Sequence, residues 1–196
     1  MCPIFKNGQA TKISNYRPIS VLPSFSKVFE KLVYNRLMKY LTKSSVLYDH
    51  QYGFRSNLST SMAILEMVEK ITDAIDNNKF SIGIFIDLSK AFDTVNHKVL
   101  VNKLHFYGLR GTALNWFKSY LSNRQQCVLC NGTASTRLPV TCGVPQGSIL
   151  GPILFLLYVN DIATVSPVLH LILFADDINI FMSHRDLPTL IHILND

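Results

Sequence analysis

The stretch that most constrains this chain is residues 170–182, HLILFADDINIFM, where two adjacent aspartates interrupt an aliphatic and aromatic run. A carboxylate that is removed from water costs several kcal/mol unless a cation pairs with it. The nearest cationic side chain in the sequence is Arg185, eight residues after Asp177. The compensating cation is therefore a basic side chain from elsewhere in the chain, or a metal ion.

The composition is that of a folded, mildly basic protein. The 196 residues, 48% of them apolar and 16% charged, suit one domain or part of a larger one and exclude disorder. The net charge of +6 favours an anionic partner. The longest apolar run, ILGPILFLLYV, is too short to span a membrane, and the first residues lack the apolar segment of a signal peptide. We expect an intracellular protein with reduced cysteines and no membrane partner, in the nucleus or the cytoplasm.

Hydrophobic periodicity predicts a mixture of helices and strands after an irregular start over residues 1–23. The first two helices are expected to bury apolar stripes, at Phe25 to Leu41 and at Ile64 to Ile75. Asn131-Gly132 is a strong signal for a hairpin turn. Helices are predicted at about 24–41, 59–75, 93–107, 112–122 and 147–162 and near the end of the chain, a hairpin at 125–143, and strands at 79–87 and 170–182.

This order lacks the regular repeat of a doubly wound sheet and predicts an α+β fold, an antiparallel sheet with helices on one face. KFSIGIFIDL is predicted to be a central strand that ends at Asp87, and Asp176 and Asp177 are expected in the turn of a hairpin. If the two strands are neighbours, the three carboxylates meet at one edge of the sheet. Divalent cations bound between them would compensate their charge.

Five segments of the chain are similar to known motifs. IFIDLSKAFDTVNHKVL, GVPQGSILGP and LFADDINIF resemble motifs A, B and C of reverse transcriptases, and NYRPISVLPSFSKVFEKLVYNRL and HQYGFRSNLST resemble the preceding fingers motifs. The five occur in the family's order between about Pro3 and Met182. Their amino-acid sequences resemble those of the same motifs in LINE-type non-LTR retrotransposons. The resemblance implies an RNA-directed DNA polymerase that acts on an RNA template, a DNA primer and dNTPs.

The resemblance also implies a fold, a right hand with an antiparallel palm sheet packed on helices. The chain would supply fingers over about residues 1–80 and mainly palm over about 81–196, with room for a fingers insertion. The thumb and a later lysine motif of the family are missing from these 196 residues, so the chain is expected to be a fragment of a reverse transcriptase domain. No oligomeric state is implied.

The resemblance assigns roles to individual residues. Asp87, Asp176 and Asp177 would be catalytic and would hold two Mg²⁺ ions, or Mn²⁺, with the carbonyl of Leu88 as a further ligand. Two such ions, ~3.5–4 Å apart, activate a primer 3′-hydroxyl and stabilise the leaving pyrophosphate. The nucleotide would contact Arg55 at its triphosphate, Phe92 beneath its deoxyribose, and the turn formed by Gln146 and Gly147.

Simpler interpretations of these residues stay open. Asp93 has a local explanation as a helix N-cap and is left out of the site. Without the resemblance, Phe92 would be a core aromatic and Gln146 part of a plain turn. Arg17, Arg36 or Lys90 could face the nucleic acid in place of Arg55.

Two other functions are weighed against reverse transcription. A viral RNA-dependent RNA polymerase is disfavoured, because such enzymes have Gly-Asp-Asp in motif C and commonly a polar residue where Phe92 stands. An inactive, truncated retrotransposon remnant that at most binds nucleic acid is the alternative from a different class. The intact carboxylates oppose it, and the missing thumb supports it.

Overall fold

The computed structural model describes residues 1–195 and divides the chain into two compact units. The first unit joins Met1–Val46 to Lys90–Tyr158, and the second joins Leu47–Ser89 to Val159–Asp196. Each unit is therefore built from two separate stretches of sequence. The expected division into fingers and palm near residue 80 stays a prediction.

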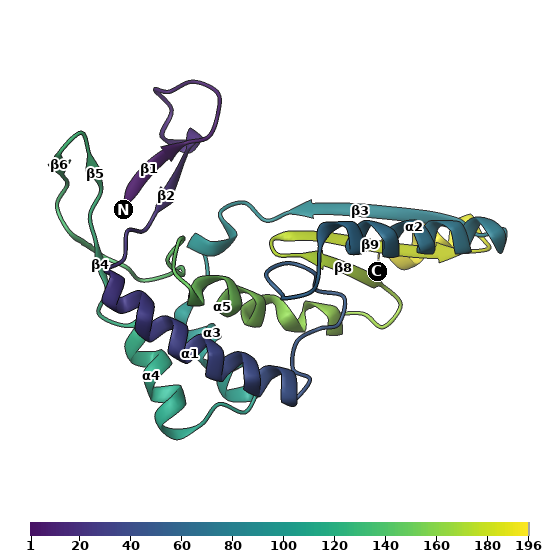
Figure 1. Ribbon diagram of the computed structural model, residues 1–196. Helices are drawn as coiled ribbons and strands as arrows, with labels where there is room; N and C mark the ends of the chain where they lie inside the picture. Colours follow the sequence, from purple (N-terminus) through teal and green to yellow (C-terminus); the bar gives the residue numbers. More distant parts are fainter. Residues whose placement is uncertain (196) are drawn as a thin grey trace. The chain divides into compact units, whose positions relative to one another are not determined.

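The first unit is mainly helical, with small antiparallel hairpins (Figure 1). Residues 1–23 were predicted to be irregular, and this is wrong, because β1 and β2 pair there. Pro3 and Pro18 are register partners, so the two missing N–H groups fall at a single pair and the hairpin survives. The elements of this unit are β1 (Cys2–Phe5), η1 (Ile13–Asn15), β2 (Tyr16–Ile19), α1 (Ser24–Lys43), η2 (Ala91–Asp93), α3 (His97–Phe106), α4 (Gly111–Leu121), β4 (Gln125–Gln126), β5 (Leu129–Cys130), β6 (Thr133–Ala134), β7 (Leu138–Pro139) and all but the last residue of α5 (Leu150–Val159).

Helix α5 is the buried centre of the first unit, as its sequence predicts. Its residues 153–157 are each at most 1% exposed. The carboxylate of Glu30, itself 3% exposed, accepts hydrogen bonds from the backbone N–H groups of Ile149 and Leu150 and from the Tyr120 hydroxyl. Because the first N–H groups of a helix lack partners within it, Glu30 satisfies the start of α5.

The apolar stripe of α1 was expected to be buried along its whole length, and this is wrong for its first half. Phe25, Val28, Phe29 and Leu32 are at least half exposed, whereas Leu37 and Leu41 are buried. At the start of α1, the helix face that packs into the core carries Glu30. The hydrogen bonds from the start of α5 to Glu30 set how α1 is rotated about its own axis.

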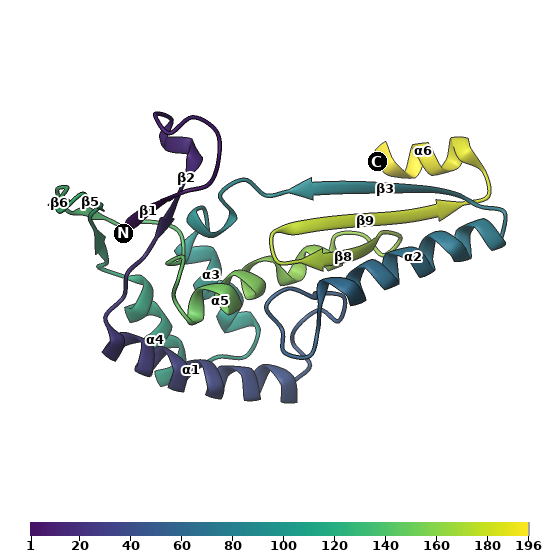
Figure 2. The same ribbon diagram turned by 45° about the horizontal axis from the view of Figure 1, so that its top comes forward.

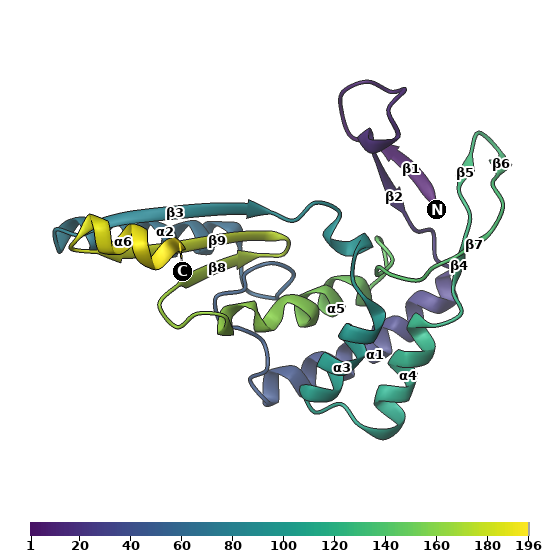
Figure 3. The same cartoon turned by 180° about the vertical axis from the view of Figure 1, so that it is seen from behind.

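The second unit is a three-stranded antiparallel sheet in the order β3-β9-β8. Its elements are α2 (Thr60–Asp76), β3 (Phe80–Asp87), η3 (Asn160–Thr164), β8 (His170–Phe174), β9 (Asp177–His184) and α6 (Leu187–Asn195). Figures 2 and 3 show α2 and α6 on opposite faces of the sheet, so the expectation of helices on one face is wrong. Leu171, Leu173 and Ile178 form the core.

Two further expectations for this unit fail. Strand β3 is an edge strand, not a central one, and its Phe85 is 68% exposed. The apolar stripe of α2 is also largely exposed, since this helix buries only Ala63 and Ala74. The start of α2 agrees with the sequence, because the Ser59 side chain caps it by accepting from the Met62 N–H.

Within residues 1–195, no helix is both long enough and apolar enough to cross a membrane.

Candidate active site

Backbone pairing brings the predicted catalytic aspartates together at one end of the strands in the second unit's sheet. Asp87, the last residue of β3, is the register partner of Asp177, the first residue of β9. Asp176 lies in the turn between β8 and β9, and its carbonyl accepts from the Leu88 N–H at 3.4 Å. The convergence expected from the sequence is therefore present in the backbone.

The turn that carries the aspartates is held in an uncommon conformation. Ala175 has a φ of +57°, in the left-handed region that L-residues other than glycine rarely occupy. The side-chain oxygen of Gln51 accepts from the Ala175 N–H at 3.0 Å and from the Gly53 N–H at 2.8 Å. Gln51 is only 2% exposed, so water does not compete for these bonds.

Gly53 completes this support by lying directly against the turn. A Cβ atom at residue 53 would lie 2.3 Å from the backbone nitrogen of Ala175. The loop that carries Gln51 and Gly53 is itself joined to β8, since the Leu173 N–H donates to the His50 carbonyl and the Tyr52 N–H donates to the Leu173 carbonyl. Gln51 and Gly53 therefore position the two-aspartate turn.

Among the described residues, the three aspartates have no basic partner. Asp87 and Asp177 are exposed and Asp176 is half-buried. Across residues 1–195, none of the three forms an ion pair with a lysine, arginine or histidine. The donors are hard carboxylate oxygens, the ligands that Mg²⁺ prefers, so the residues fit a site for divalent cations. Their ligand atoms do not cluster within 4.8 Å of one another; among the described side chains, the group that does so is His50, Glu66 and His170.

Two other predicted site residues lie in this unit. Leu88 is half-buried and packs against the core of Leu171, Leu173 and Ile178, next to Asp87 in the chain. The guanidinium of Arg55 donates through Nη1 to the Tyr48 carbonyl at 2.8 Å, so it braces its own loop. The contact of Arg55 with a triphosphate stays a prediction.

Phe92, Gln146 and Gly147 belong to the first unit. The Phe92 ring is half-buried and stacks on Phe155, with ring centroids 4.7 Å apart and an interplanar angle of 29°. Its carbonyl accepts from the Val144 N–H at 2.8 Å, which ties the motif A segment to the motif B turn.

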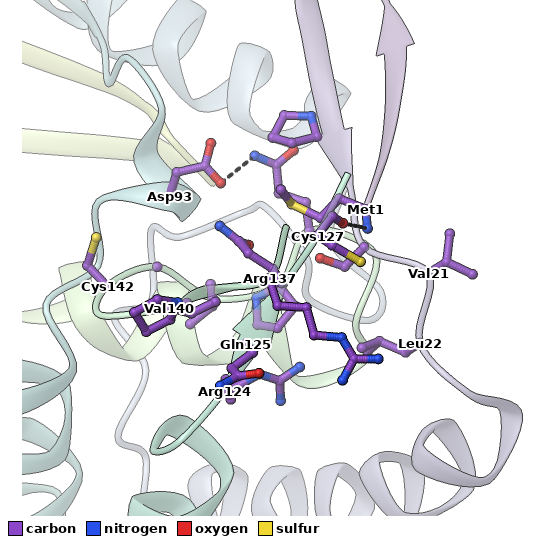
Figure 4. Close-up of a pocket in the computed structure, with 18 of the residues that line it drawn as sticks. Met1, Val21, Leu22, Asp93, Arg124, Gln125, Cys127, Arg137, Val140 and Cys142 are labelled. Carbon is purple, nitrogen blue, oxygen red and sulfur yellow. Dashed lines mark hydrogen bonds between the residues drawn. The ribbon is translucent and has the colours of Figure 1, made fainter. Parts of the chain in front are cut away.

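Asp93 was expected to cap a helix, and this is wrong. Helix α3 begins at His97 and is capped by Asn96, whose side chain accepts from the Lys98 and Val99 N–H groups. Asp93 instead accepts a hydrogen bond from the Gln146 side-chain amide at 2.9 Å (Figure 4). The residue left out of the predicted site therefore positions a residue included in it.

The glycines of the motif B turn approach the protein's own backbone. At Gly143, with a φ of +85°, an added Cβ would lie 2.8 Å from the Asp93 carbonyl oxygen. At Gly147, with a φ of +95°, it would lie 3.2 Å from the Ser20 carbonyl oxygen. These glycines permit close packing around Gln146. The contact of Gly147 with a nucleotide stays a prediction.

A cavity of about 650 Å³ opens beside this turn, within the first unit. Asp93 and Gln146 line it together with two basic side chains, Arg124 and Arg137 (Figure 4). The cavity thus presents cationic groups next to the predicted nucleotide-binding turn.

Charge is distributed very unevenly between the two units. The first contains 15 lysines and arginines and 2 acidic residues, a net charge of +13. The second contains 4 basic and 11 acidic residues, a net charge of −7. The modest overall charge of +6 therefore conceals a strongly basic unit and an acidic one that carries the aspartates.

Sequence analysis missed Gln51 and Gly53. Both stand in HQYGFR, a segment noted only for its resemblance to fingers motifs. The available signal was a glycine two residues after a polar side chain in a loop, which also fits an ordinary turn. Their role depends on pairing with residues more than 120 positions later, which local patterns do not reveal.

Comparisons with known proteins agree with this geometry. The family described as "Reverse transcriptase (RNA-dependent DNA polymerase)" matches residues 4–196. The chain is 38% identical over 169 residues to a probable RNA-directed DNA polymerase from transposon X-element of Drosophila melanogaster. It is 35% identical over 166 residues to the RNA-directed DNA polymerase from mobile element jockey of the same species. Each alignment covers 84% of this chain and 18% of the relative.

A solved structure shares the fold. An apo telomerase from Candida tropicalis, truncated from its C-terminal domain, superposes with a TM-score of 0.59 at 16% identity, over 84% of this chain and 36% of that one. The predicted resemblance to reverse transcriptases of non-LTR retrotransposons is confirmed. The match to nearly every residue places this chain in the reverse transcriptase (RNA-dependent DNA polymerase) family.

Proposed function

We propose that this chain supplies the catalytic part of an RNA-directed DNA polymerase of a non-LTR retrotransposon. The observation that carries the proposal is the pairing of Asp87 with Asp177, beside Asp176, at one end of the sheet's strands, where no basic side chain of the described residues pairs with them. Three carboxylates in that arrangement repel one another unless cations bind them. The likeness to polymerases from transposon X-element and jockey supports the same conclusion.

The carboxylates would hold two Mg²⁺ ions, which when bound activate a primer 3′-hydroxyl and stabilise pyrophosphate. Asp87 and Asp176 would be the main ligands, with Asp177 and the Leu88 carbonyl in support. Gln51 and Gly53 fix the turn that aims Asp176 and Asp177. Arg55 would contact the triphosphate, and Gln146, oriented by Asp93, would contact the incoming nucleotide.

The charge of the first unit supports a nucleic-acid partner, an RNA template with a DNA primer. A net charge of +13 attracts a phosphate backbone, and the release of condensed counterions makes such binding favourable and sensitive to salt. The acidic second unit is suited to cations instead. The two charges match the two kinds of partner that polymerisation brings together.

We expect the affinity for an RNA–DNA duplex to fall as salt rises. If the protein neutralises six to ten phosphates, binding weakens by roughly 10³- to 10⁵-fold between ~50 and ~200 mM salt. The double variant Arg124→Gln and Arg137→Gln should reduce the slope of log K against log salt by about 2, whereas Lys79→Gln in the acidic unit should leave it unchanged. Fluorescence anisotropy measures both; an unchanged slope in the double variant would remove these arginines from the interface.

Phe92 is expected to select deoxyribonucleotides over ribonucleotides. A ring beneath the sugar would leave a 2′-hydroxyl without a hydrogen-bond partner, at a cost of ~1–3 kcal/mol, and steric overlap adds to this, so discrimination of at least about tenfold is expected. Phe92→Val should lower that discrimination with a smaller loss of dNTP incorporation.

The matched control for Phe92→Val is Phe117→Val, which removes a buried ring from α4 of the same unit. Incorporation of dNTPs and rNTPs is measured separately, in a longer chain that adds the thumb. Should Phe92→Val and wild type show the same preference for dNTPs, Phe92 serves only to pack against Phe155.

The proposal is tested by primer extension with dNTPs on RNA and on DNA templates. The 196-residue chain and a longer chain with the thumb are compared. Extension on RNA by the longer chain supports a polymerase. If the longer chain binds duplex but extends no primer, the alternative of an inactive remnant is favoured.

A further inference from the structure

A second group of candidate metal ligands lies in the second unit, separate from the aspartates. His50 lies in a turn near the start of this unit, Glu66 lies on α2, and His170 is the first residue of β8. The Oε1 atom of Glu66 lies 2.6 Å from His50 Nδ1 and 2.6 Å from His170 Nε2. All three ligand atoms lie within 4.8 Å of one another.

Further contacts hold the three residues in place, two of them hydrogen bonds with residues outside the group. The Tyr52 hydroxyl donates to the other carboxylate oxygen of Glu66 at 2.5 Å. The His50 carbonyl accepts from the Leu173 N–H at 2.9 Å, which fixes its backbone against β8. The two imidazole rings meet edge to face, with centroids 4.7 Å apart. The donors therefore come from elements whose positions are already fixed.

The contacts within the group also shift its pKa values. Burial lowers the pKa of His170. Burial alone would raise the pKa of Glu66, but the hydrogen bonds from Tyr52 and His170 lower it overall. Burial and the hydrogen bond to Glu66 raise the pKa of Tyr52 to about 12.

We propose that His50, Glu66 and His170 form a binding site for a transition-metal ion of the Zn²⁺ class. Two imidazoles and one carboxylate are a ligand set that Zn²⁺ accepts, with a fourth position for water. A tetrahedral ion with ligands at about 2.0–2.2 Å holds them roughly 3.3–3.6 Å apart, so binding would move the Glu66 oxygen and each imidazole nitrogen apart by about 1 Å. Tyr52 would orient the carboxylate from outside, as partners of metal ligands commonly do.

This site differs from the aspartate site in place and in chemistry. His170 begins β8 and Asp176 follows its end, and the four steps along the strand from His170 to Phe174 span roughly 13 Å at about 3.3 Å per residue. Imidazole ligands favour Zn²⁺ or Co²⁺, whereas carboxylates alone favour Mg²⁺. A metal here would tie α2 and the 47–53 loop to β8, and that loop carries Gln51 and Gly53. The proposal does not depend on polymerase activity.

The test uses the 196-residue chain, stripped of metal and titrated first with Co²⁺ and then with Zn²⁺. We expect one equivalent of Co²⁺ to give visible absorption bands that Zn²⁺ abolishes and a tenfold excess of Mg²⁺ does not. Zn²⁺ at about 100 times its dissociation constant should shift the unfolding equilibrium about 100-fold toward the folded state. The shift is read from thermal or denaturant unfolding.

Two variants test proposed ligands, and a third is the control. His170→Gln and Glu66→Gln should lose Co²⁺ binding by at least tenfold, while His105→Gln, in the other unit, should retain it. Glu66→Gln retains the size of the side chain and an acceptor for Tyr52, so it separates loss of a ligand from loss of fold, which circular dichroism checks.

The free cysteines are the competing ligands, since Cys127 and Cys130 stand in a C-x-x-C sequence. Alkylation of the four cysteines should leave Co²⁺ binding intact. Binding that survives in Glu66→Gln and His170→Gln, or disappears on alkylation, would overturn the proposal. No binding by the wild-type chain would show that the two imidazoles only donate hydrogen bonds to Glu66.

Discussion

Asp87→Asn and Asp176→Asn are each expected to lower the rate of nucleotide addition by at least about a thousandfold, or ~4 kcal/mol of transition-state stabilisation. Asparagine keeps the shape of the side chain but removes the charge that holds the metal ions. The pairing of Asp87 with Asp177 and the bond from Leu88 to the Asp176 carbonyl use the backbone, so both survive. Removing one of three mutually repelling charges should also leave the fold equally or more stable.

Single-turnover addition of one nucleotide measures the rate, and denaturant unfolding measures the stability. Asp76→Asn is the matched control, because it removes the same charge from the same unit at the end of α2. Wild-type rates in Asp87→Asn or Asp176→Asn would mean that these carboxylates do not hold the catalytic metals.

Gly53→Ala is expected to reduce nucleotide addition by about a hundredfold. Its Cβ would lie 2.3 Å from the Ala175 nitrogen and 2.9 Å from the Ala175 Cα, and backbone atoms cannot give way as a flexible side chain can. The turn that carries Asp176 would have to move, and a displacement of about 1 Å in a catalytic group can cost about 10² in rate. The same shift breaks the bonds from Gln51 to Gly53 and Ala175.

Gly83→Ala is the control for this substitution. Gly83 lies in β3 of the same unit, and a Cβ there would meet only the Phe85 ring, at 3.5 Å. It should keep near-wild-type activity. Rates are measured as for the aspartate variants, and Gln51→Leu, which removes the acceptor, should follow Gly53→Ala. If Gly53→Ala and Gly83→Ala behaved alike, the 47–53 loop would not position the aspartates.

The sequence predicted well the features that depend on neighbouring residues. The Asn131-Gly132 turn has positive φ at both residues, and the run from Leu150 forms a buried helix. The predicted hairpin, with Asp176 in the turn between its two strands, is present. In each case, turn chemistry or continuous hydrophobicity specifies the structure locally.

Prediction from the sequence failed where the buried face of a helix, or the partner of a side chain, depends on residues far away in the chain. The apolar stripe of α1 predicts burial of Phe25 and Phe29, yet Glu30 faces the core because the N-terminus of α5 needs an acceptor. Asp93 has the type of side chain that commonly caps a helix, but it accepts a hydrogen bond from Gln146, 53 residues later. Gln51 and Gly53 contact Ala175, which lies more than 120 positions later in the sequence. Such pairings become visible only in the folded chain.

We propose that Asp87, Asp176 and Asp177 hold the divalent ions that drive DNA synthesis on an RNA template. The most direct test is the Mg²⁺ dependence of single-nucleotide addition on an RNA template, for wild type and Asp177→Asn in a chain that includes the thumb. We expect no product with a chelator present, and a Mg²⁺ midpoint raised by roughly tenfold or more in Asp177→Asn, because one of the charges that attracts the ions is gone. Extension that persists in the chelator, or identical midpoints in the two proteins, would contradict this assignment.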